Sequence, residues 1–234
     1  GEWVFSEQTA RITLVGAGAV GTWAGIGLGF AADVPTRLTI YDPDVVEPTN
    51  LNRQVLFGDA VNRPKALALS ERLHAFFPNM EAEGRVEAVE DANLAVACES
   101  DLVVCGPDTF SARALLHRGA LQSRTALVNS GTSAFGADVA AYVPELSPCL
   151  ECSLRVDTVA RAVGEEEQRA RCAGVPEASV VTSNALAGAL VAYEARATLA
   201  RRPVRGVMEY DGRSPQGRLG VRSVRKPCQC HLAS

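Results

Sequence analysis

A glycine-rich turn between two short apolar runs constrains the fold of this chain more than any other feature. Residues 11–15 (RITLV) lead into the turn, and a small-residue apolar segment follows over residues 22–30. A second apolar run, residues 37–41, ends in Asp42. This order of strand, glycine turn, helix, strand and acidic residue is typical of the first βαβ unit of a nucleotide-binding fold, whose turn brings backbone N–H groups close to phosphate. The glycines of the turn are Gly16, Gly18 and Gly21.

Strand-like and helix-like patterns alternate through the rest of the chain. Pro64 favours a helix start, and apolar residues recur at helical spacing up to residue 77. Further strands are predicted at residues 84–89, 101–105, 125–129, 136–143, 206–210 and 217–224, and further helices at 111–122 and 179–199. Parallel strands joined by helices indicate an α/β fold, a doubly wound, Rossmann-like and mostly parallel sheet. Its ligand site is expected at the carboxyl ends of the strands.

Composition and charge exclude several classes of protein. Of the 234 residues, 47% are hydrophobic and 21% are charged, which is ordinary for a soluble globular domain. No apolar run reaches the roughly 20 residues that span a bilayer. The net charge of −4 argues against a nucleic-acid partner. The opening residues lack the basic region of a signal peptide, so we expect a cytoplasmic protein with no membrane partner.

The residues of the loop after the second strand distinguish between two candidate ligands, NAD and ATP. Asp42 suits a ribose diol, and with the glycine turn it would fit an NAD-dependent oxidoreductase as well as an ATP-binding protein. Asn50, Arg53 and Gln54 follow on one short loop. A triphosphate needs such a planar cationic fork and neutral donors, whereas a dehydrogenase has no evident use for them. Lys65 adds a charge that can follow a leaving pyrophosphate.

Residues 42–57 read Asp-x-Asp-x-Val-Glu-x-x-Asn-Leu-Asn-Arg-Gln-x-Leu-Phe, and Pro-Lys-Ala follows at 64–66. This pattern resembles the adenylation domain of the ThiF/MoeB and ubiquitin-activating family, and the resemblance covers about residues 11–197. It implies an ATP-dependent adenylyltransferase that activates a carboxylate as an acyl-adenylate and releases pyrophosphate. The implied acceptor is the C-terminal glycine of a ubiquitin-like or sulfur-carrier protein, or a peptide.

The resemblance also implies a role for individual residues. Asp42 would hold the ribose. The triphosphate would be held by Asn50, Arg53, Gln54 and Lys65. Asp108 matches the Mg2+-binding aspartate of the family, although an aspartate after a strand is often only a helix N-cap. Catalysis would then rest on positioning and charge neutralisation by Arg53, Lys65 and the Mg2+ on Asp108.

Family members similar to the bacterial sulfur-carrier enzymes carry an N-terminal helix whose arginine reaches across a dimer to the ATP phosphates. The residues before Gly16 contain one arginine, Arg11, which opens the first predicted strand. The chain is therefore either excised from a longer protein or takes this arginine from elsewhere. We expect a homodimer or dependence on a partner domain, and a non-catalytic subunit of a two-chain activating enzyme is the second interpretation.

Four of the seven cysteines form two close pairs, each entered through a proline. The pairs are Cys149 with Cys152, and Cys228 with Cys230. Four thiolates fill the tetrahedral shell of zinc and leave no open position, which predicts a structural site. The family usually has Cys-x-x-Cys at both places, and His231 is an alternative ligand to Cys230. We therefore predict a single adenylation domain over residues 1–234, in which residues 145–234 include a zinc-bound appendage.

Cys172 differs from the other cysteines because it lies between the two zinc pairs. Arg169 and Arg171 stand beside it and would favour the thiolate. A cysteine stands in a similar place in the sulfur-carrier members, so a covalent role in acyl or sulfur transfer and a plain exposed thiol both remain open. The remaining cysteines and the helix histidines are predicted to be structural: Cys98, Cys105, His74 and His117.

Overall fold

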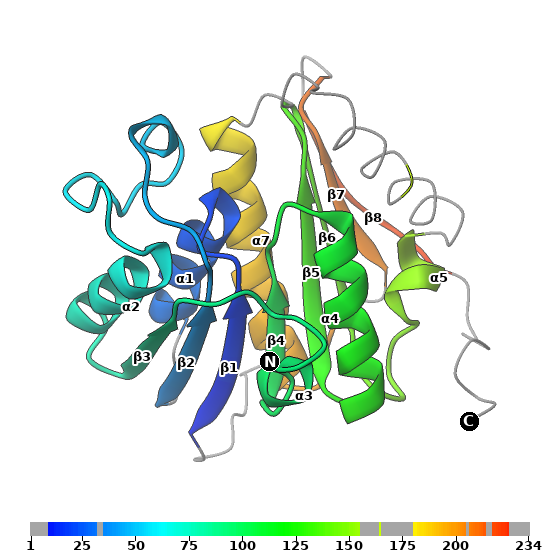
Figure 1. Cartoon of the computed structure of the whole chain (residues 1–234). Coiled ribbons are helices and arrows are strands. Elements are labelled where there is room, and N and C mark those ends of the chain that lie inside the picture. Colours follow the sequence, from blue (N-terminus) through cyan, green and yellow to red (C-terminus); the bar gives the residue numbers. More distant parts are fainter. Residues whose placement is uncertain are drawn as a thin grey trace.

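The computed structural model describes residues 9–31, 35–154, 164, 180–204, 206–213 and 217–224, and within them eight strands form one sheet. The strands are β1 (Ala10–Val15), β2 (Thr36–Tyr41), β3 (Met80–Arg85), β4 (Leu102–Cys105), β5 (Ala126–Thr132), β6 (Gly136–Tyr142), β7 (Val207–Asp211) and β8 (Arg218–Arg222). Their order is β3-β2-β1-β4-β5-β6-β7-β8 (Figure 1). The first five in this order run parallel, and β6, β7 and β8 are joined antiparallel. From β1 the chain first adds β2 and β3 on one side and then β4 and β5 on the other. Doubly wound folds bind ligands at this switch point between β1 and β4.

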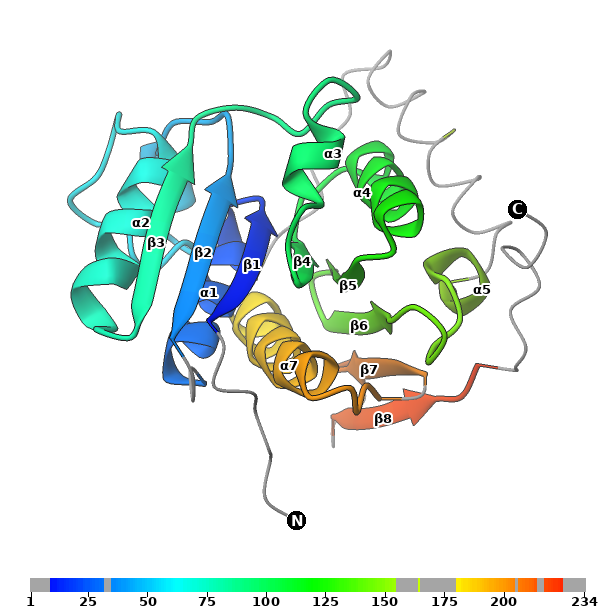
Figure 2. The same cartoon turned by 90° about the horizontal axis from the view of Figure 1, so that it is seen from below.

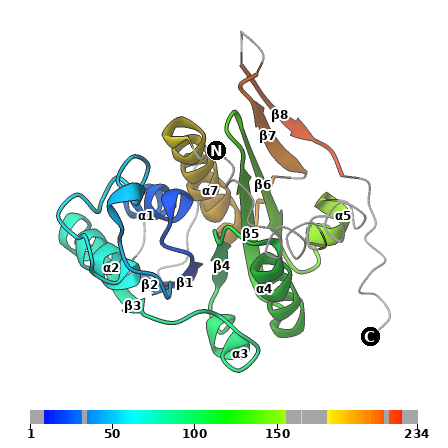
Figure 3. The ribbon, with the colours of Figure 1, turned by 45° about the horizontal axis from the view of Figure 1, so that its top comes forward.

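Helices cover both faces of the sheet. They are α1 (Ala19–Phe30), α2 (Lys65–Phe76), α3 (Leu94–Ala97), α4 (Phe110–Ser123), α5 (Leu150–Leu154) and α7 (Val181–Leu199). Helices α1, α2 and α7 lie on one side, and α3 and α4 lie on the other (Figures 2 and 3). Helix α1 packs closely along α7 because both are rich in small residues. A Cβ atom on Gly188 would stand only 2.3 Å from the Cβ of Trp23.

The core therefore has two layers, one on each face of the sheet. Strand β4 shows how the sequence supplies both, because all four of its side chains are buried. Leu102 and Val104 belong to the layer under α1, α2 and α7. Val103 and Cys105 belong to the layer under α3 and α4. Such an unbroken apolar run is typical of a parallel strand that is covered on both sides.

The predicted α/β fold with a mostly parallel sheet is confirmed, and most element boundaries lie within a few residues of the predicted ones. The strand predicted at residues 84–89 is wrong, since β3 runs over Met80–Arg85. Short helices α3 and α5 were not predicted. Among the helices that the structure describes, none combines the length and the apolar character that crossing a bilayer requires.

The described part of residues 145–234 is continuous with the main sheet. Strands β7 and β8 extend the sheet beyond β6, and α7 packs on α1 and on the central strands. Cys172 lies outside the described residues, and so do Cys228 and Cys230. The zinc-bound appendage therefore stays a prediction.

Candidate functional site

The glycine turn between β1 and α1 is as tight as its sequence predicts. Gly16 has φ +93°, a conformation that favours glycine. A Cβ atom on Gly21 would lie 2.0 Å from the carbonyl oxygen of Gly16, and one on Gly16 would lie 2.8 Å from that of Gly106. The backbone of the turn thus packs directly against the end of β4. Helix α1 starts at Ala19, so its first N–H groups open onto the carboxyl edge of the sheet.

Asp42 ties this turn to the loop that follows β2. One of its carboxylate oxygens accepts the N–H of Ala17 at 2.7 Å, and the other accepts the N–H of Asp44 at 2.8 Å. The residue is only 6% exposed. Burial raises the pKa of the Asp42 carboxyl, and the two backbone hydrogen bonds oppose that rise. Each oxygen keeps a second lone pair, so this structural role is compatible with hydrogen bonds to a ribose.

The loop with Asn50, Arg53 and Gln54 is organised by a short 3-10 helix, η1 (Pro48–Asn50). The Asn50 side-chain oxygen accepts the N–H of Glu47 at 3.1 Å, which completes a capping box and leaves the Asn50 amide group as its available donor. Arg53 donates from Nη1 to the carbonyl oxygen of Thr49 at 3.0 Å. Gln54 is buried, and its Oε1 has no hydrogen-bond partner in the described part of the chain.

Lys65 opens α2 and is almost fully buried despite its charge. Its ammonium group donates to Asp44 Oδ2 at 2.8 Å. Its backbone N–H also bonds to the carbonyl oxygen of Asp44 at 2.9 Å. These two contacts fix the long side chain beside the loop of Asp42. The structure thus brings every predicted nucleotide-binding residue to one edge of the sheet.

Asp108 follows β4 on the same edge. The helix cap expected as its ordinary role is provided by Thr109 instead, whose hydroxyl accepts the N–H of Ala112 at 3.3 Å. Asp108 is exposed, and it lines a cavity of about 1950 Å³ that also includes Gly16, Asp42 and Lys65. We call one part of its lining the β1 side of the cavity; it is formed by Gly16, Gly18, Ala19, Val20, Asp42, Asn50, Arg53, Gln54 and Lys65.

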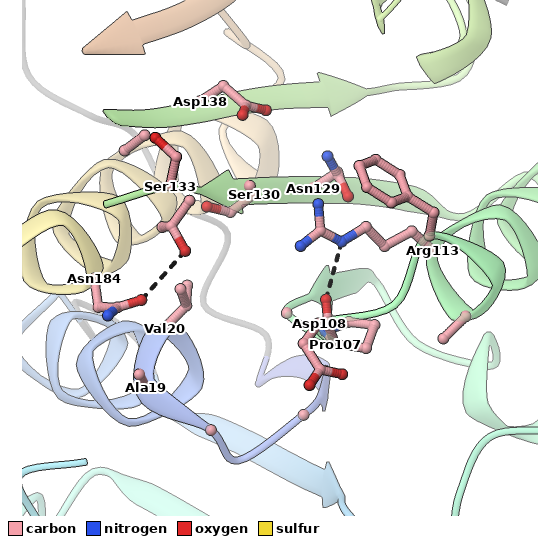
Figure 4. Close-up of a pocket in the computed structure, with 18 of the residues that line it drawn as sticks. Ala19, Val20, Pro107, Asp108, Arg113, Asn129, Ser130, Ser133, Asp138 and Asn184 are labelled. Carbon is pink, nitrogen blue, oxygen red and sulfur yellow. Dashed lines mark hydrogen bonds between the residues drawn. The ribbon is translucent and has the colours of Figure 1, made fainter. Parts of the chain in front are cut away.

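Sequence reasoning missed the opposite wall of this cavity, which we call the β5 side. It is formed by Arg113, Asn129, Ser130 and Asp138. They come from α4, from the end of β5 and from β6, and Figure 4 shows them together with Asp108. The available signal was the polar pair Asn129 and Ser130 at the carboxyl end of a predicted buried strand, which is where doubly wound folds place ligand contacts.

Cys149 and Cys152 are the two predicted zinc ligands that the structure describes. Cys149 is buried and directly precedes α5, and Cys152 lies in its first turn. A Cys-x-x-Cys pair at such a helix start fits half of a zinc site. Within the described ranges, no three His, Cys, Asp or Glu residues stand close enough to hold a metal.

The residues predicted to be structural are confirmed in that role. Burial raises the pKa of Cys98 to about 11 and that of Cys105 to about 12, so both remain thiols in the core. His117 is buried, and its Nε2 accepts the N–H of Leu150 at 3.2 Å. His74 has its Nδ1 3.2 Å from the carbonyl oxygen of Met80.

Comparison with solved structures supports the same architecture. Escherichia coli MccB, solved with ATP, superposes with a TM-score of 0.76 at 19% identity, covering 94% of this chain and 65% of MccB. PaaA superposes with a TM-score of 0.72 at 19% identity, covering 92% of this chain and 73% of that one. At this level of identity the likeness concerns the fold alone.

Sequence relatives extend the comparison beyond the fold. SAMP-activating enzyme E1 of Haloferax volcanii is 31% identical over 151 residues, which are 62% of this chain and 53% of the relative. Sulfur carrier protein adenylyltransferase of Thermus thermophilus is 31% identical over 159 residues, 62% of this chain and 55% of the relative. The chain thus spans about half the length of these relatives. The ThiF family itself matches residues 7–232, and the chain therefore belongs to the ThiF family.

Proposed function

We propose that this chain binds Mg-ATP and adenylates a carboxylate, with release of pyrophosphate. The observation that carries the proposal is the β1 side of the cavity, where a cationic and amide-bearing loop lies next to the glycine turn and Asp42. NAD, the cofactor of the alternative oxidoreductase, has no triphosphate for Arg53, Gln54 and Lys65 to bind. The names of the relatives support ATP chemistry, because the Thermus protein is an adenylyltransferase and MccB was solved with ATP.

In the proposed reaction, an acceptor carboxylate oxygen attacks the α-phosphorus of ATP. The bond from this phosphorus to the bridging oxygen breaks, and its electrons leave with pyrophosphate. Asp44 holds the Lys65 ammonium group at 2.8 Å, so this cation is positioned before ATP arrives. Such preorganised charge stabilises a transition state without further rearrangement. Arg53 would neutralise phosphate oxygens beside it.

Asp108 would hold the Mg2+ of Mg-ATP. Its place after β4 supports this role, because it lines the cavity and does not cap α4. Oxygen ligands are those that Mg2+ prefers, and one or two protein carboxylates with substrate phosphates are its usual shell. When bound, the ion neutralises charge that develops on the phosphates.

Three further features belong to the proposal. The acceptor would be the C-terminus of a ubiquitin-like or sulfur-carrier protein, or a peptide, in a cytoplasmic homodimer or partner-dependent enzyme. Cys149 and Cys152 would supply half of a structural zinc site with Cys228 and Cys230. Cys172 would act covalently after adenylation. The names of the relatives support the acceptor classes, because they include a sulfur carrier protein adenylyltransferase and a SAMP-activating enzyme.

Two measurements test the proposal. Mg-ATP at 100 times its dissociation constant should stabilise the chain by about 2.7 kcal/mol, and NAD should not. Lys65→Met and Asp108→Asn should each lower acceptor-dependent ATP–pyrophosphate exchange by roughly 100-fold or more, with the fold intact by circular dichroism. Arg37→Met and Asp91→Asn are matched controls, because both residues are exposed and lie in surface ion pairs outside the cavity lining.

If NAD raises the melting temperature and Mg-ATP does not, the proposal that the chain binds ATP is refuted. Normal exchange in Asp108→Asn would remove Asp108 from the metal site. A wild-type chain that binds Mg-ATP but performs no exchange with any acceptor would favour the partner-dependent or non-catalytic subunit.

A further inference from the structure

The cysteine turn, as we call residues 149–152, is held at both ends by side chains from distant parts of the chain. The N–H of Leu150 donates to Nε2 of His117, which lies 33 residues earlier on α4. The carbonyl oxygen of Ser153, directly after the turn, accepts a hydrogen bond from Nη1 of Arg222 on β8 at 3.1 Å. A helix of five residues gains little stability from its own hydrogen bonds, so the position of α5 depends on such contacts.

His117 holds the start of the turn from within the core. The residue is 4% exposed, and its ring meets that of Tyr142 edge-on, with centroids 6.0 Å apart and an interplanar angle of 82°. A backbone N–H only donates, so Nε2 accepts the Leu150 N–H with its lone pair. A ring packed in this way has little freedom to move, and it therefore fixes the Leu150 N–H at one place.

Arg222 holds the end of the turn through a guanidinium group that is itself fixed. Its Nε donates to Oε1 of Glu209 on the neighbouring strand β7 at 2.6 Å, while Nη1 donates to the Ser153 carbonyl group. The planar guanidinium group thus joins β7, β8 and the end of the cysteine turn. Figures 2 and 3 show α5 beside α4 and close to the β8 end of the sheet.

The segment that enters the cysteine turn is anchored as well. The hydroxyl group of Ser147 accepts the N–H of Val143 at 2.6 Å and donates to the carbonyl oxygen of Ala141 at 3.0 Å, at the end of β6. The N–H of Ser153 donates to the carbonyl oxygen of Cys149 at 3.0 Å and closes the turn. All these contacts join protein groups alone, so they can form before a metal arrives.

Ligands that are already in place lose less conformational entropy when a metal binds. We propose that His117 and Arg222 are positioning residues, which hold the cysteine turn in its zinc-binding shape before the metal arrives. Both act on backbone groups of the turn or directly beside it, and neither replaces a cysteine as ligand. The inference rests on the zinc site proposed above and is independent of the adenylation chemistry.

Paired substitutions separate these hydrogen bonds from the packing around them. His117→Phe keeps a ring beside Tyr142 but offers no acceptor to the Leu150 N–H, whereas the amide oxygen of His117→Gln can replace Nε2. Arg222→Met removes the donor to Ser153, and Arg222→Lys should restore part of its effect. Arg118→Met on α4 and Arg218→Met on β8 are the matched controls, because both arginines are exposed on the same two elements.

The first measurement uses protein that a chelator has stripped of metal. Hydrogen exchange of the Leu150 amide, followed by NMR, reports whether the turn is formed in advance. Exchange should be roughly tenfold or more faster in His117→Phe than in the wild type, as expected for the loss of one hydrogen bond. His117→Gln should restore part of the protection, and Arg118→Met should not change it.

The second measurement is the affinity for zinc, determined by competition with a chromogenic chelator. His117→Phe and Arg222→Met should each bind zinc roughly tenfold or more weakly, which is the usual effect of losing a contact that orients metal ligands. The visible spectrum of Co2+ bound in place of zinc should stay that of the wild type, because no ligand is lost. Cys149→Ser should alter this spectrum.

Each residue is judged by its own pair of variants, and the melting temperature of the metal-free proteins is measured alongside. A purely structural role would lower this temperature and leave the zinc affinity of the folded protein unchanged, which would overturn the inference. Exchange of the Leu150 amide that is equal in His117→Phe and wild type would overturn it for His117. If His117→Phe does not fold, Arg222→Met carries the test, because the Arg222 side chain is 35% exposed.

The wild type distinguishes this inference from the proposals on which it does or does not depend. If it takes up no zinc, the zinc site and the positioning roles are overturned together. Stabilisation by Mg-ATP, measured on the same samples, would still support the proposed adenylation chemistry in that case. Loss of Mg-ATP binding alone would overturn the adenylation and leave the positioning roles standing.

Discussion

Glu194 offers a quantitative test of how the core is built. It lies on α7 and is 1% exposed. Its Oε1 accepts the N–H of Val204 at 2.9 Å, while Oε2 has no partner among the described residues. Burial raises the pKa of Glu194 from 4.5 to about 7, and the hydrogen bond from Val204 opposes this rise. The folded protein therefore binds this proton more tightly than the unfolded chain does.

The sign and size of the effect follow from linkage. Between pH 4.5 and about 7 the folded state holds more protons at Glu194, so its contribution to the free energy of unfolding falls as pH rises through this window. It is constant below and above the window. A shift of about 2.5 pKa units corresponds to about 3 kcal/mol in total. Glu194→Gln keeps an oxygen for Val204 and removes the ionisation.

Urea unfolding at several pH values measures this directly. The free energy of unfolding of Glu194→Gln, relative to wild type, should increase by about 3 kcal/mol from pH 4.5 to pH 8. Glu81→Gln is the matched control, because Glu81 is an exposed partner of Arg37, and its difference should stay within about 0.5 kcal/mol. A difference for Glu194→Gln that does not change with pH would refute the raised pKa and the burial argument behind it.

Three other substitutions test the site. Asp42→Asn should lose one of the two hydrogen bonds that Asp42 accepts from the N–H groups of Ala17 and Asp44. The free energy of unfolding should fall by about 2 kcal/mol and the melting temperature by about 4–8 °C. An unchanged melting temperature would contradict the role of Asp42 in joining the turn to the loop. Gly21→Ala should displace the glycine turn and weaken Mg-ATP stabilisation, whereas Gly58→Ala, whose Cβ meets nothing within 4 Å, should not. Cys149→Ser should lose the proposed zinc, measured by elemental analysis, whereas Cys98→Ala should keep it; zinc-free wild type purified without chelator refutes the site.

Apart from Asp108, which only the family resemblance suggested, the site residues proposed from the sequence come from one stretch of the chain. The glycine turn, Asp42 and the loop up to Lys65 all lie within residues 16–65, so their spacing alone restricts their geometry. The prediction did not include the contacts that organise this loop. The side chain of Asn50 accepts the backbone N–H of Glu47 at the start of η1, and the carboxylate of Asp44 accepts a hydrogen bond from the Lys65 ammonium group.

Strand β3 shows why one boundary was wrong. Its residues Met80–Arg85 alternate between apolar or small residues and charged ones, and the same alternation continues past Arg85, so the sequence pattern does not mark where this edge strand begins and ends. Its extent is fixed by parallel pairing with β2, which begins where Thr36 meets Met80. Propensity along the chain carries little information about such a partner.

The β5 side of the cavity could not be predicted because it depends on register rather than on spacing. Asp138 comes beside Arg113 only because the antiparallel pairing of β5 and β6 places it opposite Gly131. A shift of one residue in this pairing would turn Asp138 to the other face of the sheet. The two sides of the cavity are thus built from separate stretches of the chain, which the fold of the sheet brings together.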